Sequence, residues 1–292
     1  MLFKDVARRY NTELRVHGKQ STPTASRVIK EMTHRWHNMC VEDISTDHIN
    51  DMIVELRDRD LKPSTINTYL TYLKVLFNFA NSDKCGMRFA VPSFKKLSES
   101  PKEHYLEPPQ VTKLIRYLDD LRGDMAAFAF LTGLRNNNVR LLRWEHIKNE
   151  TSMQFSADEM KSKKPLYLPL CRDAQMLLRK RKRWQNILTD TDPELGEIEF
   201  VFAQDNGKPF ARKAVCNRTW RNAVKAAGLP KGTTFHTMRH SFATDLLKSG
   251  RDLREVMEMG HWSSLNSVQR YTHMSNDQKR EVASALDGKI VF

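Results

Sequence analysis

The residue types best suited to chemistry in this chain form an ordered set of basic and aromatic side chains that ends in a tyrosine. An arginine guanidinium can hold non-bridging phosphate oxygens with a planar fork of donors. A tyrosine hydroxyl can attack phosphorus, and a lysine or a histidine can move the protons that this transfer requires. Together they indicate attack on a phosphodiester without a metal ion. The set is Arg135, Lys161, His236, Arg239, His261, Trp262 and Tyr271.

Each of these residues lies inside a short, recognisable stretch of sequence. His236 and Arg239 are spaced His-x-x-Arg, and Lys161 precedes Pro169 by eight residues. Through these stretches the chain resembles the tyrosine recombinases, the phage integrase family, and the resemblance covers nearly the whole chain. The stretches that carry it are residues 132–135, 141–144, 160–170, 236–244 and 268–273, with 63–67 and 77–80 nearer the N-terminus.

The resemblance implies a site-specific DNA recombinase. Tyr271 is expected to attack the scissile phosphate, which gives a 3′-phosphotyrosyl link and a free 5′-hydroxyl. Arg135 and Arg239 would neutralise the charge on the pentacoordinate phosphorus, the role that a metal would otherwise fill. Lys161 would protonate the leaving oxygen, and His236 would assist proton transfer at the tyrosine. No cofactor and no metal are expected.

Three features of this site leave alternatives open. The family usually carries an acidic residue three positions after the first arginine, where this chain has Asn138. Family members usually place a histidine or tryptophan nine residues before the tyrosine. That spacing favours Trp262 as a donor to the phosphate, whereas the phrase Gly-His favours His261. Lys163 and Lys164 are alternatives to the lysine at position 161.

Composition agrees with a polyanionic partner. The chain carries a formal net charge of +13. Its 292 residues are enough to form two domains, each with its own hydrophobic core. The four cysteines show no paired spacing, which argues against a disulfide framework and a zinc knuckle. The run His34, His37 and Cys40 fits one helix face better than a metal cage. No apolar stretch has the length of a membrane span and no signal-peptide pattern is present, so we expect a cytoplasmic, nucleoid-associated protein without a membrane partner.

Periodicity predicts a mainly α fold with a small β insert. Apolar spacing predicts helices at about 25–40, 43–60 and 64–80, the last capped by Ser64. The predicted domains are a helical, SAM-like core-binding domain at 1–85, a proline-rich linker at 86–109 and a catalytic domain at 110–292. Residues 151–157 and 165–168 should pair as strands, with Lys161 in their turn. The basic run 179–183 should be a solvated helix face.

The expected partner is double-stranded DNA at a specific recombination site. The resemblance also implies a homotetramer on DNA, with room for accessory DNA-bending or directionality factors, and a role in integration, excision or resolution of mobile DNA. The apolar C-terminal tail could dock on a neighbouring protomer or on its own domain. We expect the layout of compact, Xer-like members, without an N-terminal domain for distant arm sites. Side chains that could contact phosphates, or equally be solvated charges, are Arg27, Lys30, Arg35, Lys62, Lys74, Lys95 and Lys96.

Two rival functions use the same features. A type IB topoisomerase would use similar chemistry to relax supercoils without exchanging strands between partners. A catalytically silent DNA-binding regulator on the same fold is the other alternative, because loss of the usual acid at Asn138 could weaken Arg135.

Overall fold

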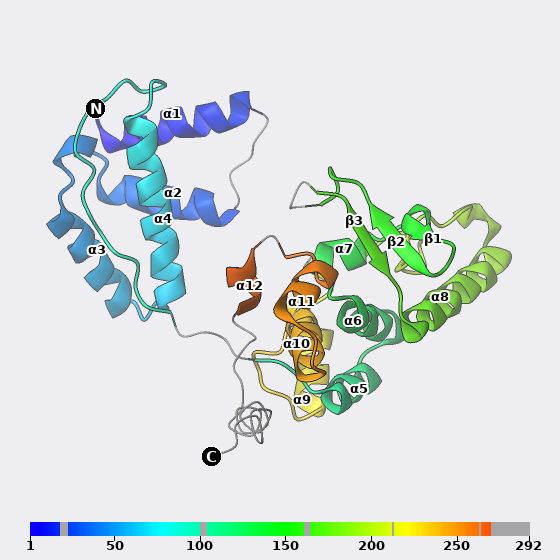
Figure 1. Cartoon of the computed structure of the whole chain (residues 1–292). Helices are drawn as coiled ribbons and strands as arrows, with labels where there is room; N and C mark the ends of the chain where they lie inside the picture. Colours follow the sequence, from blue (N-terminus) through cyan, green and yellow to red (C-terminus); the bar gives the residue numbers. More distant parts are fainter. Residues whose placement is uncertain (18–22, 100–103, 161–163, 212, 263, 270–292) are drawn as a thin grey trace, which may run out of the picture. The chain divides into compact units, whose positions relative to one another are not determined.

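The computed structural model describes residues 1–17, 23–99, 104–160, 164–211, 213–262 and 264–269. The chain forms two compact units, Met1–Pro101 and Lys102–Phe292 (Figure 1). Most of the described residues are helical and a single small sheet lies in the second unit, so the predicted fold class is confirmed. None of the helices in these described ranges is long and apolar enough to cross a membrane.

The first unit is a bundle of helices around an aromatic core. Phe3, Trp36, Tyr69 and Phe77 are buried there, and the rings of Phe3 and Trp36 meet edge to face at 5.5 Å. The predicted helices are present, together with a first helix that the periodicity did not single out. The elements are α1 (Phe3–Val16), α2 (Pro23–Arg35), the short 3₁₀ helix η1 (Val41–Asp43), α3 (Thr46–Asp58) and α4 (Pro63–Ala80).

Two helix starts in this unit show how local chemistry fixes the boundaries. Ser45 caps α3. Its hydroxyl accepts a hydrogen bond from the His48 backbone N–H, and its own backbone N–H donates to Nδ1 of the His48 side chain. The prediction that Ser64 caps α4 was wrong. Lys62 is the N-cap and Pro63 is the first helical residue, because proline has a fixed φ suited to that position and no N–H to leave unpaired.

The predicted linker, residues 86–109, is packed at both of its ends. Phe89, Phe94 and Leu97 lie against the core of the first unit, and Leu97 exchanges two hydrogen bonds with the Asn67 side chain at 2.7 and 2.9 Å. Leu106 is buried in the second unit, where its N–H donates to the Ser241 hydroxyl at 2.8 Å. The division between the two units falls inside the predicted segment, at residues 101 and 102.

The second unit is built around α6 (Asp120–Thr132), which packs against α5, α8 and α10 (Figure 1). From Met125 to Leu131 every residue of α6 is apolar, which is typical of a helix segment at the centre of a core. The other helices are α5 (Pro108–Tyr117), α7 (Asn136–Arg140), α8 (Arg172–Thr191), α9 (Arg218–Ala226), α10 (Phe235–Lys248), α11 (Leu253–Met259) and α12 (Leu265–Gln269), with 3₁₀ turns η2 (Trp144–His146) and η3 (Pro193–Leu195).

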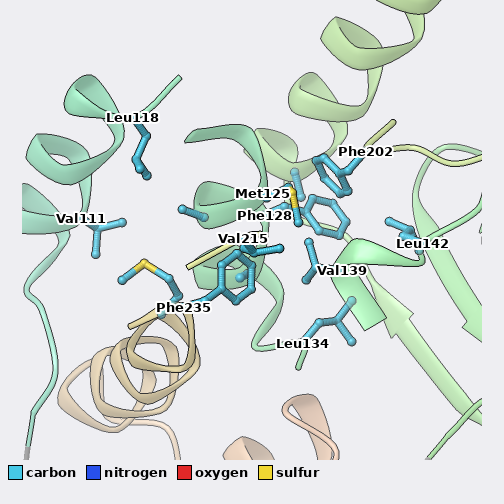
Figure 2. Close-up of a cluster of buried hydrophobic side chains, with 14 of the residues drawn as sticks. Val111, Leu118, Met125, Phe128, Leu134, Val139, Leu142, Phe202, Val215 and Phe235 are labelled. Carbon is cyan, nitrogen blue, oxygen red and sulfur yellow. The ribbon is translucent and has the colours of Figure 1, made fainter. Parts of the chain in front are cut away.

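The core of this unit joins α6 to the elements that carry the predicted site. Phe128 of α6 meets Phe202 with ring centroids 5.3 Å apart, and Leu134, Val139 and Phe235 surround this pair (Figure 2). Because these side chains come from α6, α7, α10 and the segment after η3, burial of one continuous apolar cluster fixes the helices relative to one another.

The predicted β insert is a three-stranded antiparallel sheet in the order β1-β2-β3. Strands β2 (Ser152–Phe155) and β3 (Leu166–Pro169) lie where the sequence predicts them, and Met153 is opposite Leu168. The short strand β1 (Ile147–Lys148) was not predicted, because a two-residue strand leaves no alternation in the sequence.

The basic run 179–183 on α8 is not uniformly solvated as predicted. Arg181 is only 3% exposed and donates from Nη2 to the Ala203 carbonyl at 3.1 Å. Its guanidinium also lies 4.2 Å from the ring centroid of Trp184. The other four side chains of the run are exposed. The middle arginine therefore holds the 201–203 segment against α8.

Candidate active site

The first arginine of the predicted set follows a tight turn at the end of α6. Gly133 is the C-cap of α6 and has φ +65°. A Cβ at Gly133 would lie 2.5 Å from the ring of Phe242, so both the backbone and the packing require glycine. Arg135 is then the N-cap of α7 and is half-buried. Burial lowers the pKa of the Arg135 guanidinium, because desolvation disfavours the charged form.

The second arginine is tied to that same turn. Arg239 is on α10, is 2% exposed, and donates from Nη1 to the Gly133 carbonyl. Thr234 forms a capping box with Thr237 and fixes the start of α10. The two arginines, 104 positions apart in the sequence, therefore approach one another through residues 133–135.

A sharp reversal after α11 brings His261 and Trp262 to the arginines. The backbone N–H of Trp262 donates to the Met257 carbonyl at 2.9 Å, and the backbone N–H of His261 donates to the Glu258 carbonyl at 3.0 Å. This is a Schellman ending, in which the residue after the cap takes the left-handed conformation and is usually glycine. Here that residue is His261, with φ +52°. A strained non-glycine residue at this position is typical of a functional site.

Trp262 covers the second arginine. The guanidinium carbon of Arg239 lies 3.8 Å from the centroid of the Trp262 ring, a close cation–π contact. The ring reaches this position only because residue 260 has no side chain. A Cβ at Gly260 would lie 1.6 Å from a carbon of the indole. Glycine at position 260 and tryptophan at position 262 thus each have a structural cause, whereas the backbone at position 261 does not favour histidine.

His261 lies within the electrostatic influence of both arginines. Burial is the largest cause that lowers its pKa, and the positive charges of Arg135, Arg239 and Lys164 lower it further. A hydrogen bond with the Lys164 backbone acts in the opposite direction. The net effect lowers the pKa and so favours the neutral form of the imidazole. Because these charges act on the imidazole, both arginines and Lys164 lie close to His261.

Of the remaining predicted site residues, the structure describes His236 but not Lys161 or Tyr271. His236 is exposed in the first turn of α10, with its ring 4.5 Å from the ring of His240. Lys161, its alternative Lys163, and Tyr271 lie outside the described residues. Their predicted roles remain predictions.

Asn138, at the position of the usual acid, contacts a methionine. Its Nδ2 donates to the sulfur of Met160 at 3.3 Å. Within the described residues no hydrogen bond joins the side chains of Asn138 and Arg135.

A buried histidine and a carboxylate next to this methionine were missed by the sequence reasoning. His146 Nε2 lies 2.7 Å from Glu159 Oε1, and Glu159 Oε2 accepts from the Ser156 N–H and hydroxyl at 2.9 and 2.8 Å. Burial acts to raise the pKa of Glu159, but these hydrogen bonds outweigh it and lower the pKa to about 2. No spacing rule joins residues 146 and 159, so no sequence signal could have found the pair.

The predicted DNA-contacting side chains of the first unit are all exposed. Arg27 pairs with Glu31 at 3.1 Å, and Arg35 pairs with Glu55. The predicted lysines make no ion pair within the part of the chain that the structure describes. Lys30 lines a groove of about 1140 Å³ between α1 and α2, together with Lys4, Arg8, Arg15, His34 and His37. The lining of this groove contains no acidic residue.

The sequence is similar to those of a known integrase and a known tyrosine recombinase. The integrase of Salmonella phage P22 is 25% identical over 249 residues, which are 77% of this chain and 59% of that protein. The tyrosine recombinase XerD of Staphylococcus aureus strain Mu50 is 28% identical over 263 residues, or 84% of each chain.

The fold is also shared with solved recombinase structures. The Tn1549 transposon integrase in complex with transposon right end DNA superposes with a TM-score of 0.71 at 18% identity, covering 98% of this chain and 99% of that one. A lambda integrase dimer bound to a COC′ core site gives 0.70 at 18% identity, covering 94% and 96%. Residues 104–278 match the family model described as phage integrase family. The chain therefore belongs to the phage integrase family, the tyrosine recombinases, which are enzymes that cleave and rejoin DNA strands.

Proposed function

We propose that this protein is a site-specific DNA recombinase that acts through a 3′-phosphotyrosyl intermediate at Tyr271. The observation that carries the proposal is the position of Arg239. Its guanidinium donates a hydrogen bond to the Gly133 carbonyl and is covered by the Trp262 ring. Together with Arg135 it also lowers the pKa of His261 through its positive charge. Such a cluster of fixed cations can stabilise a phosphorane whose negative charge increases in the transition state.

The proposed reaction is a transesterification. The Tyr271 oxygen forms a bond to phosphorus while the bond from phosphorus to the 5′-oxygen breaks. His236 assists removal of the tyrosine proton, and Lys161 gives a proton to the leaving 5′-oxygen. The phosphodiester is exchanged for another phosphate ester, so no external energy source is needed. In the second half the free 5′-hydroxyl of a partner strand attacks the phosphotyrosine and releases the enzyme.

The alternatives at positions 261 and 262 take different roles in this proposal. Trp262 covers one face of the Arg239 guanidinium with its ring, and this guanidinium is proposed to hold phosphate oxygens in the reaction. Burial and the nearby cations lower the pKa of His261, and its imidazole, close to both arginines, is the proposed hydrogen-bond donor to the phosphate.

The proposed substrate is double-stranded DNA, and the proposed assembly is a homotetramer on DNA. The basic composition supports a polyanionic partner, and the exposed lysines of the first unit supply charges that could follow a phosphate backbone. Integration, excision or resolution of mobile DNA in the cytoplasm, on the nucleoid, is the setting that this substrate implies.

A covalent trap tests the proposal. The protein is mixed in EDTA with labelled DNA from the borders of its own gene and is quenched with SDS, beside the Tyr271→Phe variant. Label that stays on the wild-type protein and is lost with the variant supports the proposal and allows the cleaved phosphate to be mapped. DNA that is bound without any adduct would instead support a silent DNA-binding regulator, and an absolute divalent-ion requirement would refute the mechanism.

A further inference from the structure

The chain just before Lys161 is held by two contacts that the reaction scheme does not use, one with a buried histidine and one through a buried methionine. Glu159 makes the first contact, with His146. The Arg143 N–H donates to His146 Nδ1 at 3.0 Å, so Nδ1 is an acceptor and the ring proton is on Nε2, 2.7 Å from Glu159. His146 is 6% exposed and its ring lies on that of Phe155 at 4.5 Å. Glu159 is therefore held by a histidine whose other ring nitrogen is fixed by the Arg143 backbone.

Met160 makes the second contact. Its side chain is 2% exposed within the core of the second unit, and its sulfur accepts from Asn138 Nδ2 at 3.3 Å. Asn138 belongs to α7, whose N-cap is Arg135. The residue that is joined to Lys161 by a peptide bond is thus attached to the short helix that presents the first catalytic arginine.

The chain after the lysine turn is also attached to the site. The His261 side chain forms a hydrogen bond with the Lys164 backbone, and the charge of Lys164 acts on that imidazole. Fixed points therefore flank residues 161–163 on both sides in the sequence, one at α7 and one at the reversal after α11. Glu159 and Met160 supply the first of these points.

We propose that Glu159, through His146, and Asn138, through Met160, are positioning residues that place the proton-donating lysine against the scissile phosphate. This inference rests on the proposed function. It gives a reason for the amide at position 138, because an amide N–H can donate to a sulfur atom and a carboxylate cannot. A proton donor contributes about 10²–10⁴-fold only when it is within hydrogen-bond reach of the leaving oxygen.

A substrate with a bridging 5′-sulfur at the mapped phosphate separates positioning from folding. A thiol is far more acidic than an alcohol, with a pKa of about 8.5 for the cysteine side chain, so a 5′-thiolate can leave without a proton donor. On this substrate the Tyr271 oxygen attacks phosphorus, the phosphorus–sulfur bond breaks and the thiolate departs with the electron pair. A variant that only misplaces the lysine should be slow on ordinary DNA and fast on the sulfur substrate.

Glu159→Ala and Asn138→Ala are compared with the matched surface control Glu197→Ala by single-turnover adduct formation. We expect Glu159→Ala to lose about tenfold or more on ordinary DNA and Asn138→Ala to lose less, because an N–H···S contact is the weaker one. On the sulfur substrate both should recover to near the wild-type rate, as should a Lys161→Ala protein. Glu159→Gln keeps one acceptor oxygen and should lie between wild type and alanine.

Several outcomes would overturn the inference. Equal loss on both substrates would show a general structural role, and no loss on ordinary DNA would show no role. Arg135→Ala should stay slow on both substrates, because the charge on the phosphorane develops with either leaving atom. A wild-type protein that forms no adduct on either substrate would refute the proposed function itself, and that result is distinct from failure of these positioning residues.

Discussion

Arg239 donates from Nη1 to the carbonyl of Gly133, two residues before Arg135. This bond joins α10 to the turn between α6 and α7, so the two arginines share one support. The position of the second arginine depends on the backbone that carries the first. A disturbance at residue 133 should therefore affect both.

Gly133→Ala tests this coupling. A left-handed alanine costs about 1–2 kcal/mol, and the new Cβ would also meet the Phe242 ring at 2.5 Å. We expect a loss of stability clearly larger than this backbone cost, together with strongly reduced adduct formation. Gly250→Ala is the matched control, because Gly250 has φ +81° in the same unit with nothing within 4 Å. Urea unfolding of both variants should separate the two costs, and equal losses would show that Phe242 simply moves aside.

Substitution of Trp262 distinguishes its ring from its N–H. Trp262→Ala removes the aromatic face that covers Arg239 and should slow adduct formation by about tenfold or more, since a desolvated cation–π contact contributes about 2 kcal/mol. Trp262→Phe keeps an aromatic face and should retain most of the rate. Single-turnover rates on the same labelled DNA provide the measurement. If phenylalanine is as slow as alanine, the indole N–H itself contacts the phosphate and the role assigned to His261 is incorrect.

His261→Gly should make the protein more stable and less active. The left-handed backbone at His261, φ +52°, costs a non-glycine residue about 1 kcal/mol, which glycine relieves. The imidazole is lost at the same time, so the adduct rate should fall. Glu150→Gly is the control, because Glu150 has φ +58° in the β1–β2 turn of the same unit. It should gain similar stability with unchanged activity. A destabilised His261→Gly protein would mean that the imidazole contributes more to folding than to the reaction.

The His-x-x-Arg stretch and the β-hairpin could be predicted because their signals are local, whereas the meeting of the two arginines was expected only from the resemblance to a known family. A helical period shows α2, α3 and α4, and alternating apolar residues show β2 and β3. Contacts between distant segments left no such trace. Arg181 looked solvated within a charge run, although the 201–203 carbonyls bury it against α8. The partner of Asn138 could not be predicted either, because Met160 lies 22 residues further along the chain and outside α7.

The contact between Glu159 and His146 predicts a specific dependence of stability on pH. The pKa of Glu159 is about 2, below its ordinary value of 4.5, because hydrogen bonds from Ser156 and His146 outweigh the effect of burial. A carboxyl with a depressed pKa stabilises the fold above its unfolded pKa, and this stabilisation is lost as pH falls through the folded pKa. Wild type should therefore exceed Glu159→Gln in free energy of unfolding at about pH 6, and the difference should shrink below about pH 4.5 and approach zero near pH 2. Because this side chain is more than a third exposed, the whole difference should be small. Urea titrations of both proteins across this range give the measurement. A difference that stays constant with pH would show that packing, and not the anion, holds Glu159 in place.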